Sequence, residues 1–94
     1  MSYILVRHTV GDYAKWKPFF DQHGTTRKAS GSKGARVFRS AANPNEITIL
    51  MEWDNLKNAQ QFTQSPDLRE IMEKAGVTGK PDIYFLDQVE TQPA

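Results

Sequence analysis

His8 and His23 are the residues of this sequence best suited to acid–base chemistry. Imidazole is the side chain whose unperturbed pKa lies closest to neutrality, so each histidine is a candidate general base or acid. His23 lies in the segment "DYAKWKPFFDQHGTTRK", residues 12–28, which also contains Asp12 and Arg27. A base together with an arginine that holds the resulting anion suits the removal of a proton from a hydroxyl group.

The spacing within residues 12–28 places these groups on one side of a helix. At about 100° per residue, a stripe roughly 80° wide collects the polar and the aromatic residues together. The stripe contains Asp12, Trp16, Phe19, His23 and Arg27, with Tyr13 and Phe20 at its edge. Lysines and a glutamine occupy the opposite side. An amphipathic helix with ionisable groups on its apolar face indicates a pocket lined by that face.

Each of these polar residues also has an ordinary structural interpretation. His8 alternates with apolar residues, so it could be a hydrogen-bonded histidine on a packed face rather than the wall of a cavity. His23 lies near a helix end, where the helix dipole favours a cation. Asp12 could be only the N-cap of the helix, and Arg27 only a helix-end or ion-pair residue. The sequence leaves both interpretations open for all four residues.

The large aromatic residues have the same two interpretations. They could form part of the core, or they could form a platform for a ring-shaped ligand. The candidates for the platform are Trp16, Phe19, Phe20, Trp53 and Phe85.

Two carboxylates, Glu52 and Asp87, lie in strand-like segments among apolar neighbours. Burying a carboxylate is costly unless it is paired or lies at a rim. Arg7, Arg36 and Arg39 could form a network with them, within one chain or between two subunits. Catalytic carboxylates are the alternative.

Residues 24–45 contain five basic side chains and no acidic one. This stretch could bind an anion, or it could be a solvated basic loop. It contains no phosphate-binding glycine motif, so a nucleotide site is not supported.

Length and composition predict a single domain over residues 1–94. The chain has a formal net charge of +1 and no cysteine. The near balance of charges gives no argument for nucleic acid or for a membrane surface, and the lack of cysteine excludes disulfides and thiolate chemistry. The two histidines do not have the spacing of a metal site. The N-terminal apolar run is too short for a membrane helix, so a cytoplasmic protein is expected.

Four strands are expected from β-branched and aromatic runs between turn residues. They cover residues 3–10, 36–42, 46–53 and 81–90, with a flexible loop at 29–35 and a turn at 43–45.

Two helical regions are expected between these strands. The first should begin at about Trp16 after a loose turn, with Pro18 in its first turn and Gly24 a weak point. The second, capped by Asp54, should have two parts, 55–64 and 66–75, because Ser65 and Pro66 form a new helix start. The order is βαββαβ, a ferredoxin-like α+β fold with an antiparallel sheet and two helices on one face.

The strand faces predict a partner for the second face of the sheet. In residues 46–53 one face carries isoleucine, methionine and tryptophan, but the other still carries Leu50. Leu5, Tyr84 and Leu86 make the same face of their strands apolar. A face in contact with water should be polar, so a second subunit is expected to cover it.

The element order and the segment "EWDNLKNAQQFTQSPDLREIM", residues 52–72, resemble the antibiotic-biosynthesis monooxygenase-like family of the dimeric α+β barrel superfamily. The resemblance implies a homodimeric barrel and a role for Trp53 as a pocket wall. Family members commonly carry a histidine about nine residues after this tryptophan, where this chain has Phe62, so haem is not implied.

These observations give one leading functional hypothesis and one alternative. The leading hypothesis is a small homodimeric enzyme without a cofactor, which oxygenates or cyclises an aromatic or polyketide-like substrate between the sheet and the first helix. His8 or His23 would be catalytic, and the substrate would contact Asp12, Trp16, Phe20, Arg27, Trp53 and Phe85. The alternative is a non-catalytic dimeric binding module for small hydrophobic ligands, or a stress-related protein.

Overall fold

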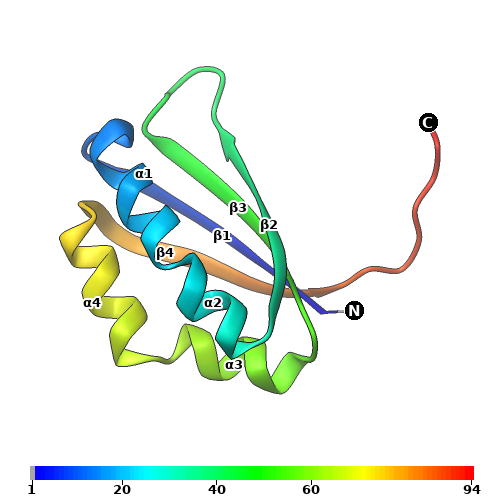
Figure 1. The fold of residues 1–94 in the computed structure, drawn as a ribbon. Coiled ribbons are helices and arrows are strands. Elements are labelled where there is room, and N and C mark those ends of the chain that lie inside the picture. Colours follow the sequence, from blue (N-terminus) through cyan, green and yellow to red (C-terminus); the bar gives the residue numbers. More distant parts are fainter. Residues whose placement is uncertain (1) are drawn as a thin grey trace.

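The computed structural model describes residues 2–94 and has a ferredoxin-like α+β fold (Figure 1). Each of the two expected helical regions is split in two. The elements in order are β1 (Ser2–Val10), α1 (Tyr13–Gln22), α2 (Gly24–Ser30), β2 (Ser32–Arg39), β3 (Glu46–Trp53), α3 (Leu56–Thr63), α4 (Pro66–Lys74) and β4 (Val77–Asp87).

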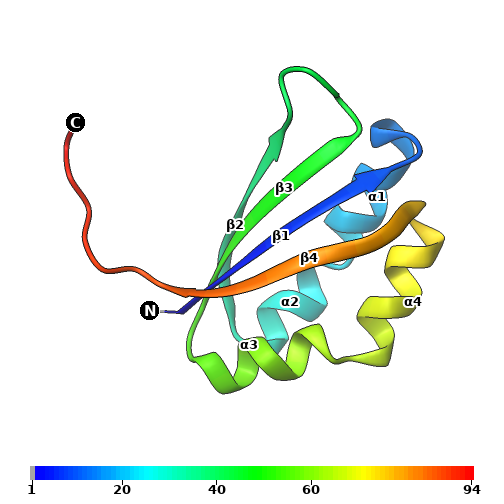
Figure 2. The same cartoon turned by 180° about the vertical axis from the view of Figure 1, so that it is seen from behind.

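The four strands form one antiparallel sheet in the order β2-β3-β1-β4. All the helices lie on one face of this sheet, and the view from behind shows the other face without a helix (Figure 2). The chain after β4 extends away from the sheet. None of the helices in residues 2–94 is long and apolar enough to cross a membrane.

The core lies between the sheet and the helices because β1 and β3 alternate strictly between two faces. Every second residue of β3 from Ile47 to Trp53 is buried under the helices. The same holds for β1, whose buried face carries Ile4, Val6, His8 and Val10. The predicted bounds of β3, 46–53, are confirmed to the residue.

The first helix differs from the expectation at its start. It begins at Tyr13 rather than Trp16, because the Asp12 side chain caps it and accepts a hydrogen bond from Ala14 N at 2.9 Å. Pro18 therefore lies inside α1, where it has no N–H to donate to the preceding turn. The break predicted at Gly24 is confirmed, since α1 ends at Gln22 and α2 begins at Gly24.

Two other predicted boundaries were wrong, because strand pairing extends β2 and β4 beyond their predicted starts. The supposed loop 29–35 is divided between α2 and β2, with Gly31 at φ 122° as the turn between them. A side chain at Gly31 would collide with the Asp54 carboxylate. β4 begins at Val77 rather than at 81, because residues 77 and 78 pair with the end of β1.

The second helical region has the expected break but a different first cap. Asn55, not Asp54, is the N-cap of α3, and its side chain accepts a hydrogen bond from Asn58 N at 2.8 Å. Ser65 caps α4 with Pro66 as the first helical residue, as predicted.

The uncovered face of the sheet is apolar at its centre. Leu5 and Leu50 are half-buried there, while Tyr84 and Phe38 are each 52% exposed and Leu86 is 42% exposed. Arg7 and Glu46 form an ion pair on this face. Within residues 2–94 the expected pairing of Glu52 and Asp87 with arginines is not found.

Candidate functional site

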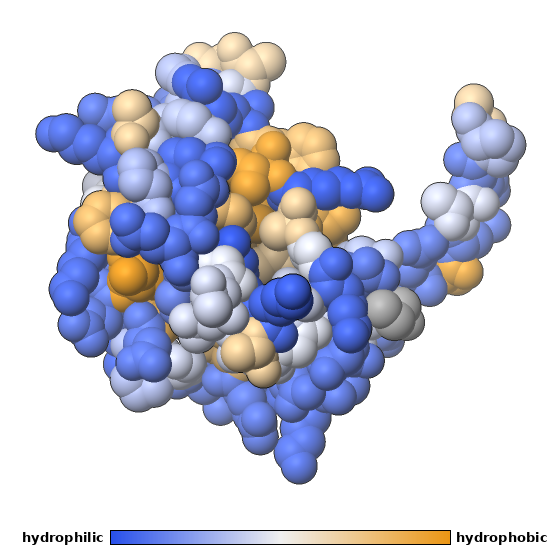
Figure 3. All heavy atoms as spheres, in the orientation of Figure 1, coloured by the Kyte–Doolittle hydropathy of each residue, from blue (hydrophilic) through white to orange (hydrophobic). Residues whose placement is uncertain are grey.

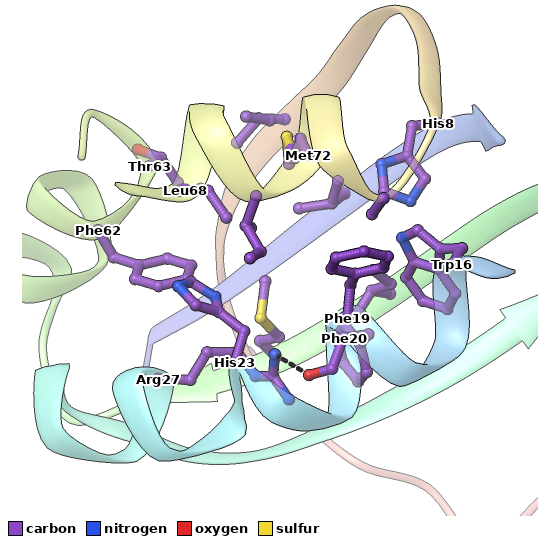
Figure 4. Close-up of a pocket in the computed structure, with 16 residues that line it drawn as sticks. His8, Trp16, Phe19, Phe20, His23, Arg27, Phe62, Thr63, Leu68 and Met72 are labelled. Atoms are coloured by element: carbon purple, nitrogen blue, oxygen red, sulfur yellow. Dashed lines mark hydrogen bonds between the residues drawn. The ribbon is translucent and has the colours of Figure 1, made fainter. Parts of the chain in front are cut away.

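An apolar pocket lies between the helix-covered face of the sheet and residues of all four helices, α1 to α4 (Figure 4). Its floor comes from β1, β3 and β4, through residues such as Val6, Ile49 and Ile83. Figure 3 shows hydrophobic surface at the gap between α4 and α1. The polar residues that line the pocket are His8, His23, Arg27 and Thr63. A mostly apolar cavity with a few polar groups is typical of a ligand site.

His8 lies at one end of the pocket and is only 5% exposed. Neither of its ring nitrogens has a hydrogen-bond partner in the described part of the chain. Its ring meets that of Trp16 nearly edge to face, with the centroids 5.7 Å apart. Burial lowers the pKa of His8 to about 4. The imidazole is therefore neutral at pH 7 and has a free lone pair with which to accept a proton.

Aromatic rings connect His8 to the other end of the pocket. Trp16 stacks on Phe20 with the centroids 5.0 Å apart. The guanidinium of Arg27 lies 3.8 Å from the centre of the Phe20 ring and donates to the Phe20 carbonyl at 2.8 Å. This wall presents flat surfaces against which a ring-shaped ligand could pack.

His23 and Arg27 occupy the end opposite His8. His23 joins α1 to α2, and its ring lies against Phe62 with the centroids 5.8 Å apart. Burial lowers the pKa of His23, the nearby charge of Arg27 lowers it further, and Asp67 acts in the opposite direction. His23 and Arg27 are both half-buried, whereas His8 is buried, so this end of the pocket is less enclosed than the end at His8.

The cavity itself encloses about 50 Å³. A single benzene ring occupies cavities of about 150 Å³, so a polycyclic ligand requires the lining side chains to move apart. Phe19, Phe20 and Met72 are half-buried and can do so more easily than the fully buried residues of the sheet.

Comparison with known families and solved structures identifies proteins that are similar to this chain. The family model of antibiotic biosynthesis monooxygenase matches residues 17–74, more than half of the chain.

The chain belongs to the antibiotic biosynthesis monooxygenase family.

Several solved structures share the fold of this chain at low sequence identity. A Bordetella bronchiseptica protein assigned as an antibiotic biosynthesis monooxygenase superposes with a TM-score of 0.80 at 19% identity, covering 95% of this chain and 97% of its own. SnoaB, a cofactor-independent oxygenase from Streptomyces nogalater, gives 0.79 at 14% identity, covering 99% and 97%. Rv0793 from Mycobacterium tuberculosis gives 0.72 at 13%, covering 96% of each chain. A comparison with curated protein sequences finds no match.

Eight residues were predicted from the sequence to form the site, and five of them line this pocket. These five are His8, Trp16, Phe20, His23 and Arg27. The helical stripe therefore lines the pocket, apart from its first residue.

The remaining three residues lie elsewhere. Asp12 caps α1. Trp53 is fully buried against Phe62, with a ring centroid distance of 4.9 Å, and lies outside the pocket lining. Phe85 is on the helix-covered face, but β4 is an edge strand and leaves this ring 39% exposed outside the lining.

Sequence reasoning missed the wall formed by α4. Leu68, Ile71, Met72 and Ala75 all line the pocket. Their spacing of three, four and seven residues is the signature of an apolar helix face, and it could have identified this wall. Phe62 of α3 also lines the pocket.

Among residues 2–94 no group of three or more histidine and carboxylate side chains is placed to hold a metal ion.

Proposed function

We propose that this chain is a homodimeric, cofactor-independent enzyme that oxygenates or cyclises a phenolic, aromatic or polyketide-like substrate in the pocket between the sheet and its helices. The observation that carries the proposal is His8, a neutral base with both ring nitrogens unpaired inside an otherwise apolar cavity. A buried polar group without a partner is costly, and a ligand hydroxyl would satisfy it.

In the proposed reaction the substrate supplies the electrons. His8 accepts the proton of a phenolic hydroxyl, and the negative charge spreads through the ring to a carbon atom. In oxygenation that carbon reacts with O₂, and the resulting peroxide takes back the proton held by His8 to give a hydroperoxide, which loses water to leave a carbonyl group. In cyclisation the same carbon attacks a carbonyl group of the substrate, and no oxidant is needed. Arg27 stabilises the anion at the opposite end of the pocket.

His8 is preferred to His23 as the base because of its position. Both of its ring nitrogens are unpaired at the enclosed end of the pocket, where a bound hydroxyl group could reach one of them. Burial lowers the pKa of both histidines, and a phenolate formed beside His8 would supply the negative charge that offsets this effect on its imidazolium. SnoaB, which shares the fold, is described as a cofactor-independent oxygenase, and this supports the same class of reaction here.

The dimer rests on the uncovered sheet face. On this face Leu50, Leu5 and Tyr84 are directly paired across β3, β1 and β4, and Leu86 lies two residues further along β4, opposite Tyr3. Monomeric proteins seldom leave a large continuous apolar patch in water. A second copy packed sheet to sheet about a two-fold axis would cover it and close an α+β barrel.

Oxygen consumption with a panel of phenolic polycycles tests the proposal. Purified protein is expected to consume O₂ with those phenols that fit the pocket, and to consume none with their methyl ethers, which have no hydroxyl proton to remove. Absence of turnover across the panel would overturn the proposed oxygenase activity. Saturable binding of both phenols and ethers without any turnover would favour a non-catalytic binding module instead.

A further inference from the structure

Arg27 belongs to two concave surfaces at once. It lines the apolar pocket, and it also lines a second, open groove formed by α2 and the start of β2. We call this second surface the basic groove; its polar side chains are Arg27, Lys28, Ser32 and Lys33. The groove contains about 470 Å³ of space, so it can accept a group that the 50 Å³ pocket cannot.

No acidic side chain balances the positive charge of the basic groove. None of its lining residues is Asp or Glu. In residues 2–94, Arg27 forms no ion pair; its guanidinium donates a hydrogen bond to the Phe20 carbonyl and lies over the Phe20 ring. Burial lowers the pKa of Arg27, and the negative charge of Asp21, which forms an ion pair with Lys17, acts in the opposite direction. A half-buried cation without a counter-ion is complementary to an anion supplied from outside.

We infer that the ligand of the apolar pocket is an aromatic carboxylate, whose ring lies between Phe20 and α4 and whose carboxylate lies against Arg27 at the entrance to the basic groove. The inference rests on the proposed function, because it assigns a ligand class to the same pocket. The planar guanidinium matches a carboxylate with two parallel hydrogen bonds, and Lys28 and Lys33 add positive charge beyond it.

This arrangement also explains how the ligand is oriented. His8 and Arg27 lie at opposite ends of the pocket (Figure 4). A carboxylate fixed at Arg27 directs the far side of the ring system towards His8, where a hydroxyl would meet the unpaired imidazole.

Calorimetric titration with naphthoate and with its neutral analogue naphthamide tests the inference. Naphthoate is expected to bind about 10- to 100-fold more tightly, the usual contribution of hydrogen bonds to a charged group. Arg27→Gln should remove that preference, because it weakens naphthoate far more than naphthamide. The exposed double variant Lys28→Gln/Lys33→Gln, which spares the pocket, should weaken naphthoate alone by a smaller factor and make its affinity less dependent on salt.

Lys15→Gln, an exposed change on α1 away from the groove, is the matched control and should alter neither affinity. Equal binding of naphthoate and naphthamide to the native protein would overturn the carboxylate inference while leaving the pocket as a ligand site. Failure of both compounds to bind would instead overturn the pocket, and with it the proposed function.

Discussion

Replacing His8 by leucine is expected to stabilise the protein while removing the proposed oxygenase activity. Leucine has a similar volume and no polar atoms, so the variant no longer buries two unpaired ring nitrogens. The free energy of unfolding should rise by about 1–3 kcal/mol, the cost of leaving a buried polar group unsatisfied. Turnover should fall by about 10²- to 10⁴-fold, the usual contribution of a general base. Urea unfolding and oxygen consumption measure the two effects on the same preparation.

The pH dependence of stability provides an internal check on this result. Folding lowers the pKa of His8 from 6.5 to about 4, so between these values the unfolded chain binds more protons than the folded one. The wild-type protein should therefore lose stability as the pH falls from 6.5 to 4, and the advantage of His8→Leu should grow over the same range. A leucine variant that is less stable than the wild type at pH 7 would show that His8 has a structural partner.

Replacing Leu5 by glutamate is expected to separate the proposed dimer. Leu5 lies on the uncovered sheet face in the central strand β1, directly opposite Leu50 of β3 and Tyr84 of β4. A carboxylate without a cationic cross-strand partner, buried there by a second sheet, would cost about 3–5 kcal/mol, which weakens association by about 10²- to 10³-fold or more. Sedimentation at micromolar concentration should show a dimer for the wild type and a monomer for Leu5→Glu.

Gln60→Glu provides the matched control for that experiment. It adds the same charge on the exposed side of α3, away from the sheet face, and should leave the dimer intact. A wild-type protein that sediments as a single species near the chain mass of 10.7 kDa would contradict the sheet-to-sheet assembly.

The sequence correctly predicted those helices and strands that are determined by their own local residue pattern. The segment 46–53 has apolar residues at alternate positions and forms β3, a central strand with a neighbouring strand on each side. Both of its predicted ends therefore agree with the structure. Ser65 and Pro66 carry their own helix-start chemistry, so the break between α3 and α4 was visible in the sequence. By contrast, Gly76 and Gly79 suggest a turn before residue 81, yet β4 begins at Val77 because Val77 and Thr78 pair with the end of β1.

The same distinction applies to the candidate site. Trp16, His23 and Arg27 were found because helical spacing alone places them on one stripe, and the break at His23 does not disturb that alignment. Phe85 depended on which strand lies at the sheet edge, and the sequence does not specify strand order. The contribution of α4 likewise depended on how that helix packs, although its spacing marked the buried face.

The spectrum of a bound hydroxyanthraquinone tests most directly the claim that the pocket holds a base. The phenol and phenolate forms of this dye absorb at different wavelengths. At a pH where the free dye is a phenol, the wild-type protein and His23→Leu are expected to bind it as the phenolate, and His8→Leu to bind it as the phenol. A neutral phenol spectrum in the wild-type complex, or a phenolate spectrum that survives in His8→Leu, would contradict the role of His8 as the base.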